Sequence, residues 1–521
     1  MASNMNAFRQ LRFQKKVLFL FCLPVFFILH AYNENFGLLP LSVISSLFLQ
    51  YMLVAICILA ISVLLFKDFN KADTFSFYLL SVFFLFGAFH DFLKDSSLFN
   101  FISSYSILVP LFFIITILLF FYIKLRRDNS AFSMRYFYYL VSIFLLLEVG
   151  TFIYNIATHE TQKNDLSGEP FPVSGKTVCS TEKKPDIYFI VLDGYTSSQC
   201  LKEEFNYDNS ATDSLFTRNQ FYISAASKSN YNVTPFSLSS TFNLGYLKEG
   251  IEDNMISTKV FLQAMETLKN NKLMTFLAGQ GYNIKNYGCF DMKQASTKTD
   301  PYFKNLYYTQ VDNQTFFSRL WADIGWNFTL KNVFTRQFQI PESYKKNKVY
   351  HLYRNDYNLK GLITELNTHS DTPKFVYTHL ILPHEPFFLD SMGQLVSDTS
   401  ILLNSINMKN GYLGQVKYSN RVLNNIIQSI PKSDGREKVI IIEGDHGFRN
   451  YEPEVPEYKV FMNLNAYYFS DGDYSNLYNG ISPVNSFRVI LNKYFCQSMP
   501  LLKDSSIFLV NNMLKDKTNK R

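Results

Sequence analysis

The feature that most constrains this chain is a series of five long apolar segments in its N-terminal third. They cover residues 17–32, 41–66, 75–90, 99–123 and 136–157. A membrane-spanning helix needs about 20 largely apolar residues, and the second and fourth segments exceed that length. The first and third are shorter and would have to recruit flanking residues. A short apolar segment can also be a buried helix of a soluble domain, but five in succession predict a membrane bundle of about five spans.

Basic residues predict the orientation of this bundle. Four Lys or Arg residues precede the first segment and four lie between the fourth and fifth, whereas the connection from the first to the second has none. Because Lys and Arg concentrate in cytoplasmic connections, we expect the N-terminus in the cytoplasm. An odd number of spans then places everything after about residue 158 outside. The net charge of +7 includes these flanking residues, so it does not indicate nucleic-acid binding.

The remainder of the chain has the pattern of an α/β domain. Residues 158–184 are polar and contain Gly and Pro, which is typical of a linker between a bundle at 1–157 and a domain at 185–521. Strand-like stretches then alternate with helical patterns, which predicts a mainly parallel sheet covered by helices on both faces. The strand candidates are residues 185–195, 220–226, 374–382, 438–442 and 460–469.

The six cysteines divide between the two parts of the chain. Cys22 and Cys57 fall in membrane segments, where we expect apolar packing. The other four lie in the part predicted to be exported, where disulfides are permitted, and their spacing leaves all three pairings open. These four are Cys179, Cys200, Cys289 and Cys496.

Glu148 is an acidic residue inside the fifth apolar segment. Carboxylates within membrane segments are either functional or bonded to a neighbouring helix. We favour the second interpretation, in which Glu148 faces the bundle and bonds a neighbour.

Two of the predicted strands end in residues that can bind a metal. Asp193 follows the apolar stretch of the first, and Asp445 and His446 follow the stretch at 438–442. In open α/β sheets, ligands bind beyond the carboxyl ends of the strands. A carboxylate beside an imidazole suits zinc or manganese. An isolated pair would more simply be a turn acid and a surface histidine, and the second strand end makes a metal site the stronger hypothesis.

A hydroxyl-rich turn precedes a predicted helix at Thr234. Pro235 follows, and proline is favoured in the first turn of a helix. A side-chain oxygen there lies near backbone N–H groups that favour anions, so a metal-bound Thr234 oxygen could attack phosphorus. The plainer interpretation is that Thr234 only caps the helix.

Two histidines lie in or after the strand at 374–382. His384 stands in a proline-bounded turn at the same predicted rim, where it could donate a hydrogen bond to a phosphoryl oxygen or a leaving group. His379 falls within the strand, where we expect a core histidine with satisfied hydrogen bonds.

Four motifs together resemble the alkaline phosphatase–sulfatase superfamily. They are "PDIYFIVLDGY", "SNYNVTPFSLSS", "LPHEPF" and "EGDHG". The order and spacing are similar to those of the membrane-anchored branch that contains lipoteichoic acid synthases and lipid A phosphoethanolamine transferases. The resemblance implies five spans in a bacterial inner membrane and a periplasmic or extracellular α/β/α domain like alkaline phosphatase. It further implies one divalent metal (zinc, manganese or magnesium) bound by Asp193, Thr234, Asp445 and His446, with Thr234 as nucleophile and His384 on the substrate side.

The chain also departs from parts of that superfamily. Sulfatases carry Cys or Ser followed by x-Pro-x-Arg, whereas this chain reads "TPFSL". Two-metal members need a further acid, which "HLILPH" lacks, so the sequence predicts a single metal. Glu385 stands where relatives often have an uncharged residue.

These features predict a transferase that works at the membrane. Thr234 would take a phospho-headgroup from a phospholipid or other lipid-linked donor and pass it to an envelope lipid or glycan, with no nucleic-acid partner. A hydrolase of phosphate or sulfate esters is the first alternative. An inactive membrane sensor or scaffold is the second.

Overall fold

The computed structural model consists of two compact units, each described here by itself. The first comprises residues 1–164 and 304–337, and the second comprises 165–303 and 338–521. Domain boundaries at residues 157 and 185 stay a prediction, and most of the predicted linker at 158–184 lies outside the described residues. The structure describes residues 19–126, 134–158, 164–168, 184–248, 254–299, 303–324, 342–397, 400, 408–431, 435–449 and 456–511.

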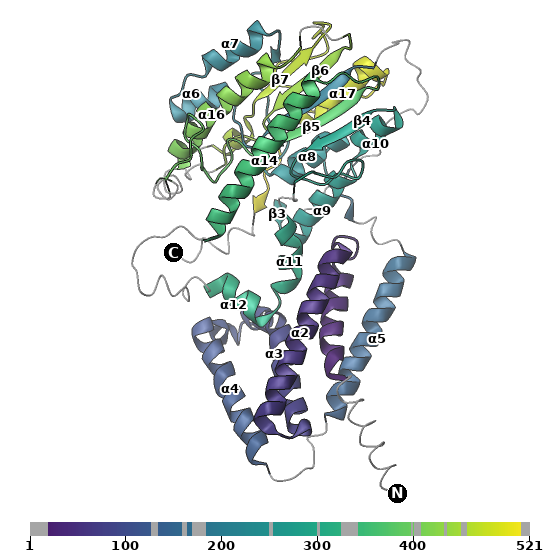
Figure 1. The fold of residues 1–521 in the computed structure, drawn as a ribbon, viewed down its shortest axis with the longest axis vertical. Helices are drawn as coiled ribbons and strands as arrows, with labels where there is room; N and C mark the ends of the chain where they lie inside the picture. The colour runs from purple at the N-terminus through teal and green to yellow at the C-terminus, as the bar shows by residue number, and fades with distance from the viewer. Residues whose placement is uncertain are drawn as a thin grey trace. The chain divides into compact units, whose positions relative to one another are not determined.

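The first unit is built from apolar helices (Figure 1). Four of its helices are long and apolar enough to cross a membrane: α2 (Leu41–Phe66), α3 (Phe69–Asp95), α4 (Tyr105–Leu125) and α5 (Arg135–Ala157). The helix Phe19–Glu34 is apolar but shorter within the described residues. α3 extends beyond the uncharged segment 75–90 at both ends, as the sequence required. The number of crossings stays a prediction.

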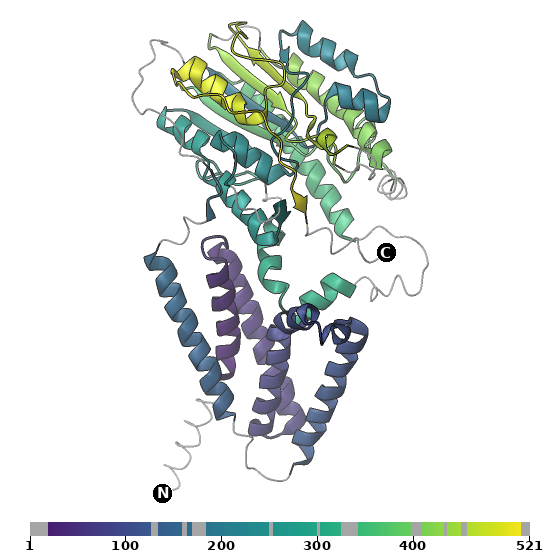
Figure 2. The same ribbon diagram turned by 180° about the vertical axis from the view of Figure 1, so that it is seen from behind.

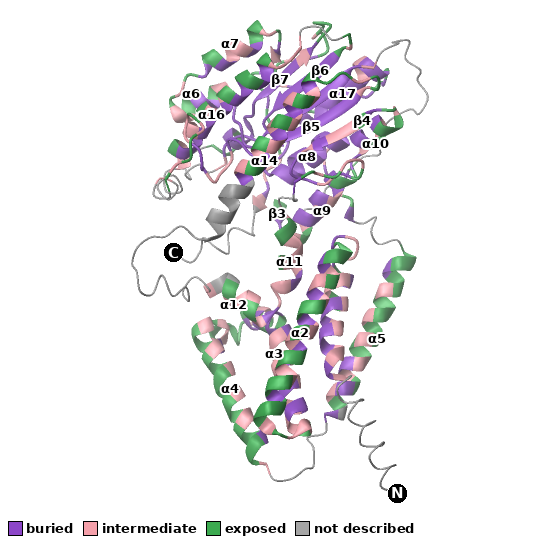
Figure 3. Ribbon diagram, in the orientation of Figure 1, coloured by how far each residue is buried: buried purple, intermediate pink, exposed green. Residues whose placement is uncertain are grey.

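The helices of this unit expose large apolar side chains. Leu53 of α2, Leu118 of α4 and Leu146 of α5 are 60%, 65% and 70% exposed. Much of α4 is coloured as exposed or intermediate in Figure 3, in contrast to the buried strands of the second unit. Such surfaces are unfavourable in water and favourable in lipid.

Glu148 is paired within this bundle, as the sequence favoured. Its Oε1 lies 2.8 Å from His30 Nδ1, and Asn33 Nδ2 donates to its Oε2 at 2.7 Å. The carboxylate therefore links α5 to the helix Phe19–Glu34.

The second unit contains a six-stranded sheet in the order β2-β7-β6-β1-β5-β4. β1 lies at the centre and pairs in parallel with β5 and β6, and β4 pairs in parallel with β5. β7 is antiparallel to both of its neighbours, so the mainly parallel sheet is confirmed. The strands are β1 (Asp186–Leu192), β2 (Tyr222–Ile223), β4 (Asn283–Tyr287), β5 (Lys374–Leu380), β6 (Lys438–Glu443) and β7 (Asn465–Phe469).

Helices cover both faces of this sheet (Figures 1 and 2). On one face, Ile190 and Ile442 pack in a core with residues of α6, α7, α14 and α16. On the other, Phe189 of β1 contacts Phe242 of α8 and Phe487 of α17, with ring centroids 5.3 and 5.1 Å apart. The central strands are buried along their whole length because both faces are covered, which explains their continuous apolar sequences.

The helices among the described residues of the second unit are α6 (Ser198–Phe205), α7 (Ser210–Arg218), α8 (Thr234–Asn243), α9 (Thr258–Lys269), α10 (Lys272–Gly279), α14 (Glu342–Asn367), α16 (Met408–Gln428) and α17 (Pro483–Phe495), with the 3-10 helix η5 (Glu457–Phe461). A small parallel pair, β3 (Met255–Ile256) and β8 (Val510–Asn511), lies outside the main sheet.

The cysteines of the second unit are in different states. Cys496 is disulfide-bonded, whereas Cys200 and Cys289 are buried thiols. Cys179 lies outside the described residues. A disulfide is typical of a domain that is not in the cytoplasm.

Candidate active site

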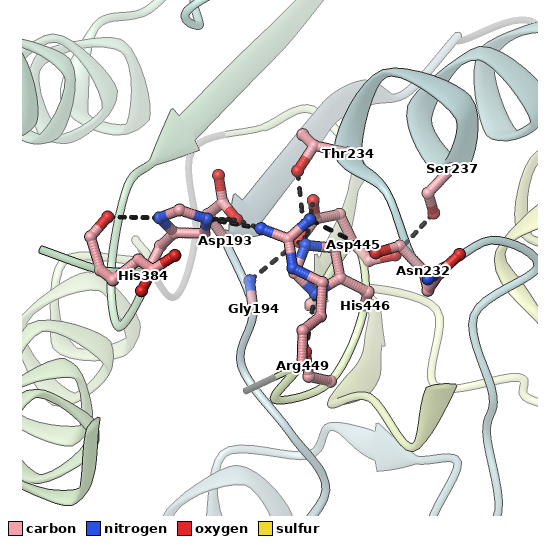
Figure 4. Close-up of polar contacts among 12 residues, drawn as sticks. Asp193, Gly194, Asn232, Thr234, Ser237, His384, Asp445, His446 and Arg449 are labelled. Atoms are coloured by element: carbon pink, nitrogen blue, oxygen red, sulfur yellow. Dashed lines mark hydrogen bonds and ion pairs between the residues drawn. The ribbon is translucent and has the colours of Figure 1, made fainter. Parts of the chain in front are cut away.

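The site lies where three adjacent parallel strands end. Asp193 directly follows β1, and Asp445 and His446 follow β6 on one side of it. His384 follows β5 on the other side. Because the carboxyl ends of neighbouring parallel strands meet at one edge, the sheet order β6-β1-β5 brings these residues together (Figure 4).

Thr234 enters the site from α8. It is the first residue of that helix and is 5% exposed. Val233 holds the N-cap position, and within the described residues no side chain caps the helix. The Thr234 Oγ1 instead lies 3.4 Å from His446 Nε2. The interpretation of Thr234 as a helix cap is therefore wrong, because its hydroxyl points toward the strand ends.

Each carboxylate of the site has one oxygen that the protein holds. The Gly194 backbone N–H donates to Asp445 Oδ1 at 2.9 Å, and His379 Nε2 lies 3.3 Å from Asp193 Oδ2. Gly194 has φ of 73°, and an added Cβ there would be 3.4 Å from the His446 ring. Glycine at this position therefore lets the turn after β1 approach both Asp445 and His446.

The other oxygen of each carboxylate faces the centre of the site. Among the described residues, Asp193 Oδ1 and Asp445 Oδ2 are buried and have no hydrogen-bond partner. His446 Nε2 lies 3.6 Å from the first and 3.5 Å from the second. Buried polar oxygens without partners are costly, so these two require a ligand.

His446 presents an unprotonated nitrogen to this centre. Its Nδ1–H donates to the backbone oxygen of Gly447 at 2.7 Å, which leaves Nε2 as the lone-pair side. Burial, and next the Arg449 guanidinium, lower the pKa of His446 to about 4, so the ring is neutral at pH 7. A divalent metal such as zinc is commonly bound by this set of atoms: two carboxylate oxygens, a neutral imidazole and a hydroxyl. These residues therefore fit the single divalent metal that the sequence predicts.

Asp193 is ionised in this environment. Burial by itself raises the pKa of a carboxyl, but His384, His379 and His446 oppose it, and the pKa of Asp193 lies below its ordinary value. An ionised carboxylate is the form that binds a metal.

His379 reaches the site, although we expected it to be a core histidine. It is buried within β5, as expected, and its Nδ1 lies 3.0 Å from the Tyr377 hydroxyl. Its other nitrogen, however, faces Asp193, and Asp193, His379 and Asp445 can bring ligand atoms within 4.8 Å of one another. We regard His379 as the support of Asp193, because His446 alone contacts both inward oxygens. The pairing of β1 with β5 puts His379 there, and periodicity does not reveal it.

Arg449 was also missed by the sequence analysis. Its Nη2 donates to His384 Nε2 at 2.6 Å, and its Nη1 donates to the Asn232 backbone oxygen at 3.4 Å. His384 Nε2 is itself 3.9 Å from Asp193 Oδ1. The only sequence signal was the position of Arg449 three residues after His446.

A pocket opens beside these residues. It combines a cation and an acid with buried aromatic rings, and it reaches His446 of the site. Its lining consists of Gly194, His384, Glu385, Phe387, Tyr412, His446, Gly447, Phe448 and Arg449.

The fold and the site define a membrane enzyme with an α/β/α catalytic unit and an acid–histidine–threonine centre at the carboxyl ends of its strands. Residues 208–487 match the family model Sulfatase, which is more than half of the chain. The chain belongs to the Sulfatase family, within the alkaline phosphatase–sulfatase superfamily. The alternative of an inactive scaffold is set aside.

Comparisons with other proteins give more distant likenesses. No curated protein matches the sequence. The phosphoethanolamine transferase EptA from Neisseria meningitidis is 11% identical, with 92% of this chain and 94% of that chain covered and a TM-score of 0.40. The periplasmic domain of EptC from Campylobacter jejuni is 13% identical over 60% of this chain and 90% of that one, with a TM-score of 0.35. A putative sulfatase from Bacteroides thetaiotaomicron is 10% identical over 63% and 74%, with a TM-score of 0.36. At this distance the solved structures say nothing about the activity of this chain.

Proposed function

We propose that this enzyme transfers a phospho-headgroup from a phospholipid donor to an envelope lipid or glycan, with Thr234 as the nucleophile. The observation that carries the proposal is the Thr234 hydroxyl. It caps no helix within the described residues, and it lies 3.4 Å from His446 Nε2, the atom that is itself 3.6 and 3.5 Å from the two inward carboxylate oxygens.

One divalent metal would be held by Asp193, Thr234, Asp445 and His446. When bound, it would lower the pKa of the Thr234 hydroxyl and offset negative charge on the phosphoryl group. His379 and the Gly194 N–H would fix the outer oxygens of the two acids, which keeps the inner oxygens aimed at the centre.

The group transfer would take two steps. The Thr234 oxygen, having lost its proton, bonds to phosphorus as the bond from phosphorus to the lipid oxygen breaks, and that oxygen leaves as an alcohol after taking up a proton. An acceptor hydroxyl then bonds to phosphorus and gives up its proton, and the Thr234 oxygen is released. His384 and Arg449 line the pocket beside the centre. Arg449 would donate hydrogen bonds to phosphoryl or leaving oxygens, and His384 would do so when its Nε2, which here accepts from Arg449, carries the proton instead.

Three observations support a lipid substrate outside the cytoplasm. The bundle has four helices suited to a membrane, and tethering to it raises the effective concentration of lipid-borne donors. The basic residues favour an exported second unit. The disulfide at Cys496 is typical of an oxidising compartment.

Acid quenching tests the covalent route. The purified full chain, loaded with zinc or manganese, is mixed with vesicles of phosphatidylethanolamine and phosphatidylglycerol and quenched in acid. We expect a headgroup on the peptide that contains Thr234 by mass spectrometry, and none in Thr234→Ala. An unmodified peptide during active turnover would refute the covalent intermediate.

The same samples separate transfer from hydrolysis. A headgroup found on an added lipid or glycan acceptor supports the transferase, whereas release of free headgroup only would favour a hydrolase of phosphate esters. The family match is the observation that favours this second candidate.

A further inference from the structure

A segment between β4 and α14 leaves the catalytic unit and belongs to the apolar bundle. Residues 304–337 cluster with residues 1–164, whereas the chain on both sides of this segment belongs to the catalytic unit. Its described part forms α11 (Lys304–Asp312) and α12 (Phe316–Ile324). The segment is not needed to complete the sheet, so its role must lie in the first unit.

Specific polar contacts hold the segment on the bundle. Asp312 accepts a hydrogen bond from the Tyr51 hydroxyl of α2, and the Gly87 N–H of α3 donates to the Gln314 backbone oxygen at 2.9 Å. A Cβ at position 87 would lie 2.4 Å from Gln314, so glycine permits this close approach. Arg319 forms an ion pair with Asp91 of α3.

These contacts place α12 at the level where the apolar part of α3 ends. No Asp, Glu, Lys or Arg lies between Asp73 and Asp91, whereas Asp91, Lys94 and Asp95 follow in its last two turns. Asp91 is 41% exposed in this ion pair, and an exposed carboxylate is costly among acyl chains, which favours access to headgroups or water. α12 therefore meets α3 at its boundary with water rather than at the depth of the acyl chains.

The exposed side of α12 is apolar, and its Phe317 ring centroid also lies 6.1 Å from that of Phe83 on α3. Phe316 packs inward, with its ring centroid 4.8 Å from that of Phe86, whereas Phe317 and Trp321 are 66% and 64% exposed. Residues four apart lie on the same side of a helix, so these two form one surface.

The connection between α3 and α4 also exposes apolar side chains. Leu98 and Phe101 are 76% and 70% exposed. Ile102 and Tyr105 pack with Phe316 on the same small apolar cluster, so this connection and α12 are neighbours. An apolar surface of this kind is not left to water in a stable protein.

We infer that Phe317 and Trp321 of α12, with Leu98 and Phe101, form an anchor in the lipid–water boundary of the bilayer. The occupant is lipid because these residues adjoin α3 and α4, whose own Phe92 and Phe113 are 63% and 62% exposed, as apolar side chains in contact with lipid would be. A short helix with aromatic residues on one side and a charged residue paired at its edge suits this boundary, where tryptophan concentrates. The anchor fastens the catalytic unit to the membrane at a second place in the chain.

Tryptophan fluorescence tests this inference directly, because the chain has only Trp321 and Trp326. The full-length Trp326→Phe variant is reconstituted in phosphatidylcholine vesicles whose acyl chains carry bromine either near the headgroup or near the bilayer centre. We expect the shallow bromine to lower Trp321 emission by about twofold and the deep bromine to lower it less.

A matched variant calibrates depth. Leu118 is 65% exposed on α4, and Leu118→Trp in the Trp321→Phe, Trp326→Phe background should be quenched more by the deep bromine. The anchor would be refuted if aqueous acrylamide quenched the fluorescence of Trp321 and neither bromolipid did. The anchor would also be refuted if neither acrylamide nor a bromolipid quenched Trp321, because protein would then cover this surface. In either case, quenching of tryptophan at position 118 by the deep bromine shows that the bundle spans the membrane and that the anchor itself is wrong. If neither bromolipid quenches either tryptophan, the bundle has failed to insert.

Discussion

Thr234→Ala separates chemistry from stability more sharply than any other change in the chain. The substitution removes one buried methyl group and a hydroxyl that caps no helix within the described residues. Loss of a buried methyl costs about 1 kcal/mol, and no capping bond is lost in addition. We therefore expect a decrease in melting temperature of no more than about 3 °C, together with a fall in turnover of at least about a thousandfold.

Ser239→Ala is the matched control on the same helix. Its hydroxyl is fully buried and donates to the Ala264 backbone oxygen of α9 at 2.8 Å, rather than to a residue of the candidate site. Loss of that hydrogen bond also costs about 1 kcal/mol. The two variants should thus have similar stability, and Ser239→Ala should keep its activity.

The assay is headgroup release from phospholipid vesicles, measured beside thermal unfolding for both variants. Thr234→Ser keeps the attacking oxygen and should retain part of the turnover. Full turnover by Thr234→Ala on an accepted substrate would remove Thr234 from the mechanism. Inactivity of Ser239→Ala at normal stability would show that the loss in Thr234→Ala is not specific.

Three further outcomes are expected. Asp445→Asn should keep the acceptor for the Gly194 N–H but weaken metal binding about tenfold or more, and full metal content by mass spectrometry would contradict the ligand assignment. A reporter that is active only in the cytoplasm, fused after Arg521, should be silent, and strong activity would place the catalytic unit on the other side. Burial, and next the nearby His384, lower the pKa of His351 from 6.5 to about 4, so protonation favours the unfolded state. The stability that neutral His351 contributes is complete above pH 6.5 and is lost as the pH falls toward 4, by about 2 kcal/mol at pH 5. His351→Gln should therefore lose less stability than the unchanged chain between pH 7 and pH 5 in denaturant titrations, and equal losses would contradict this.

The central strands could be predicted from sequence because they are buried on both faces. Their continuous apolar residues predict strands at 185–195, 374–382 and 438–442, which correspond to β1, β5 and β6. Strands at the edges gave weaker patterns. β4 has the polar sequence NIKNY and was missed, β2 covers only two residues of the stretch 220–226, and residues 460–461 belong to η5 rather than to β7.

The structure brings the predicted ligand residues together because each follows a central strand or begins a helix. Sequence patterns could not show that His379 supports Asp193 or that Arg449 contacts His384, since both contacts depend on how strands pair and how the turn after β6 folds. The association of the segment at 304–324 with the bundle could not be predicted for a different reason. α12 has only nine residues, and its amphipathic pattern is also that of an ordinary helix in a soluble domain.

The path of the chain has a consequence for proteolytic release of the enzyme. The chain passes between the two units after residues 164, 303 and 337. A protease that cut only within 158–184 would break the covalent link, but the catalytic unit would still be held on the bundle by the noncovalent contacts of the segment at 304–337. Shedding of a soluble enzyme would also require loss of those contacts or further cuts on both sides of that segment, so a single nick leaves catalysis confined to the plane of the membrane.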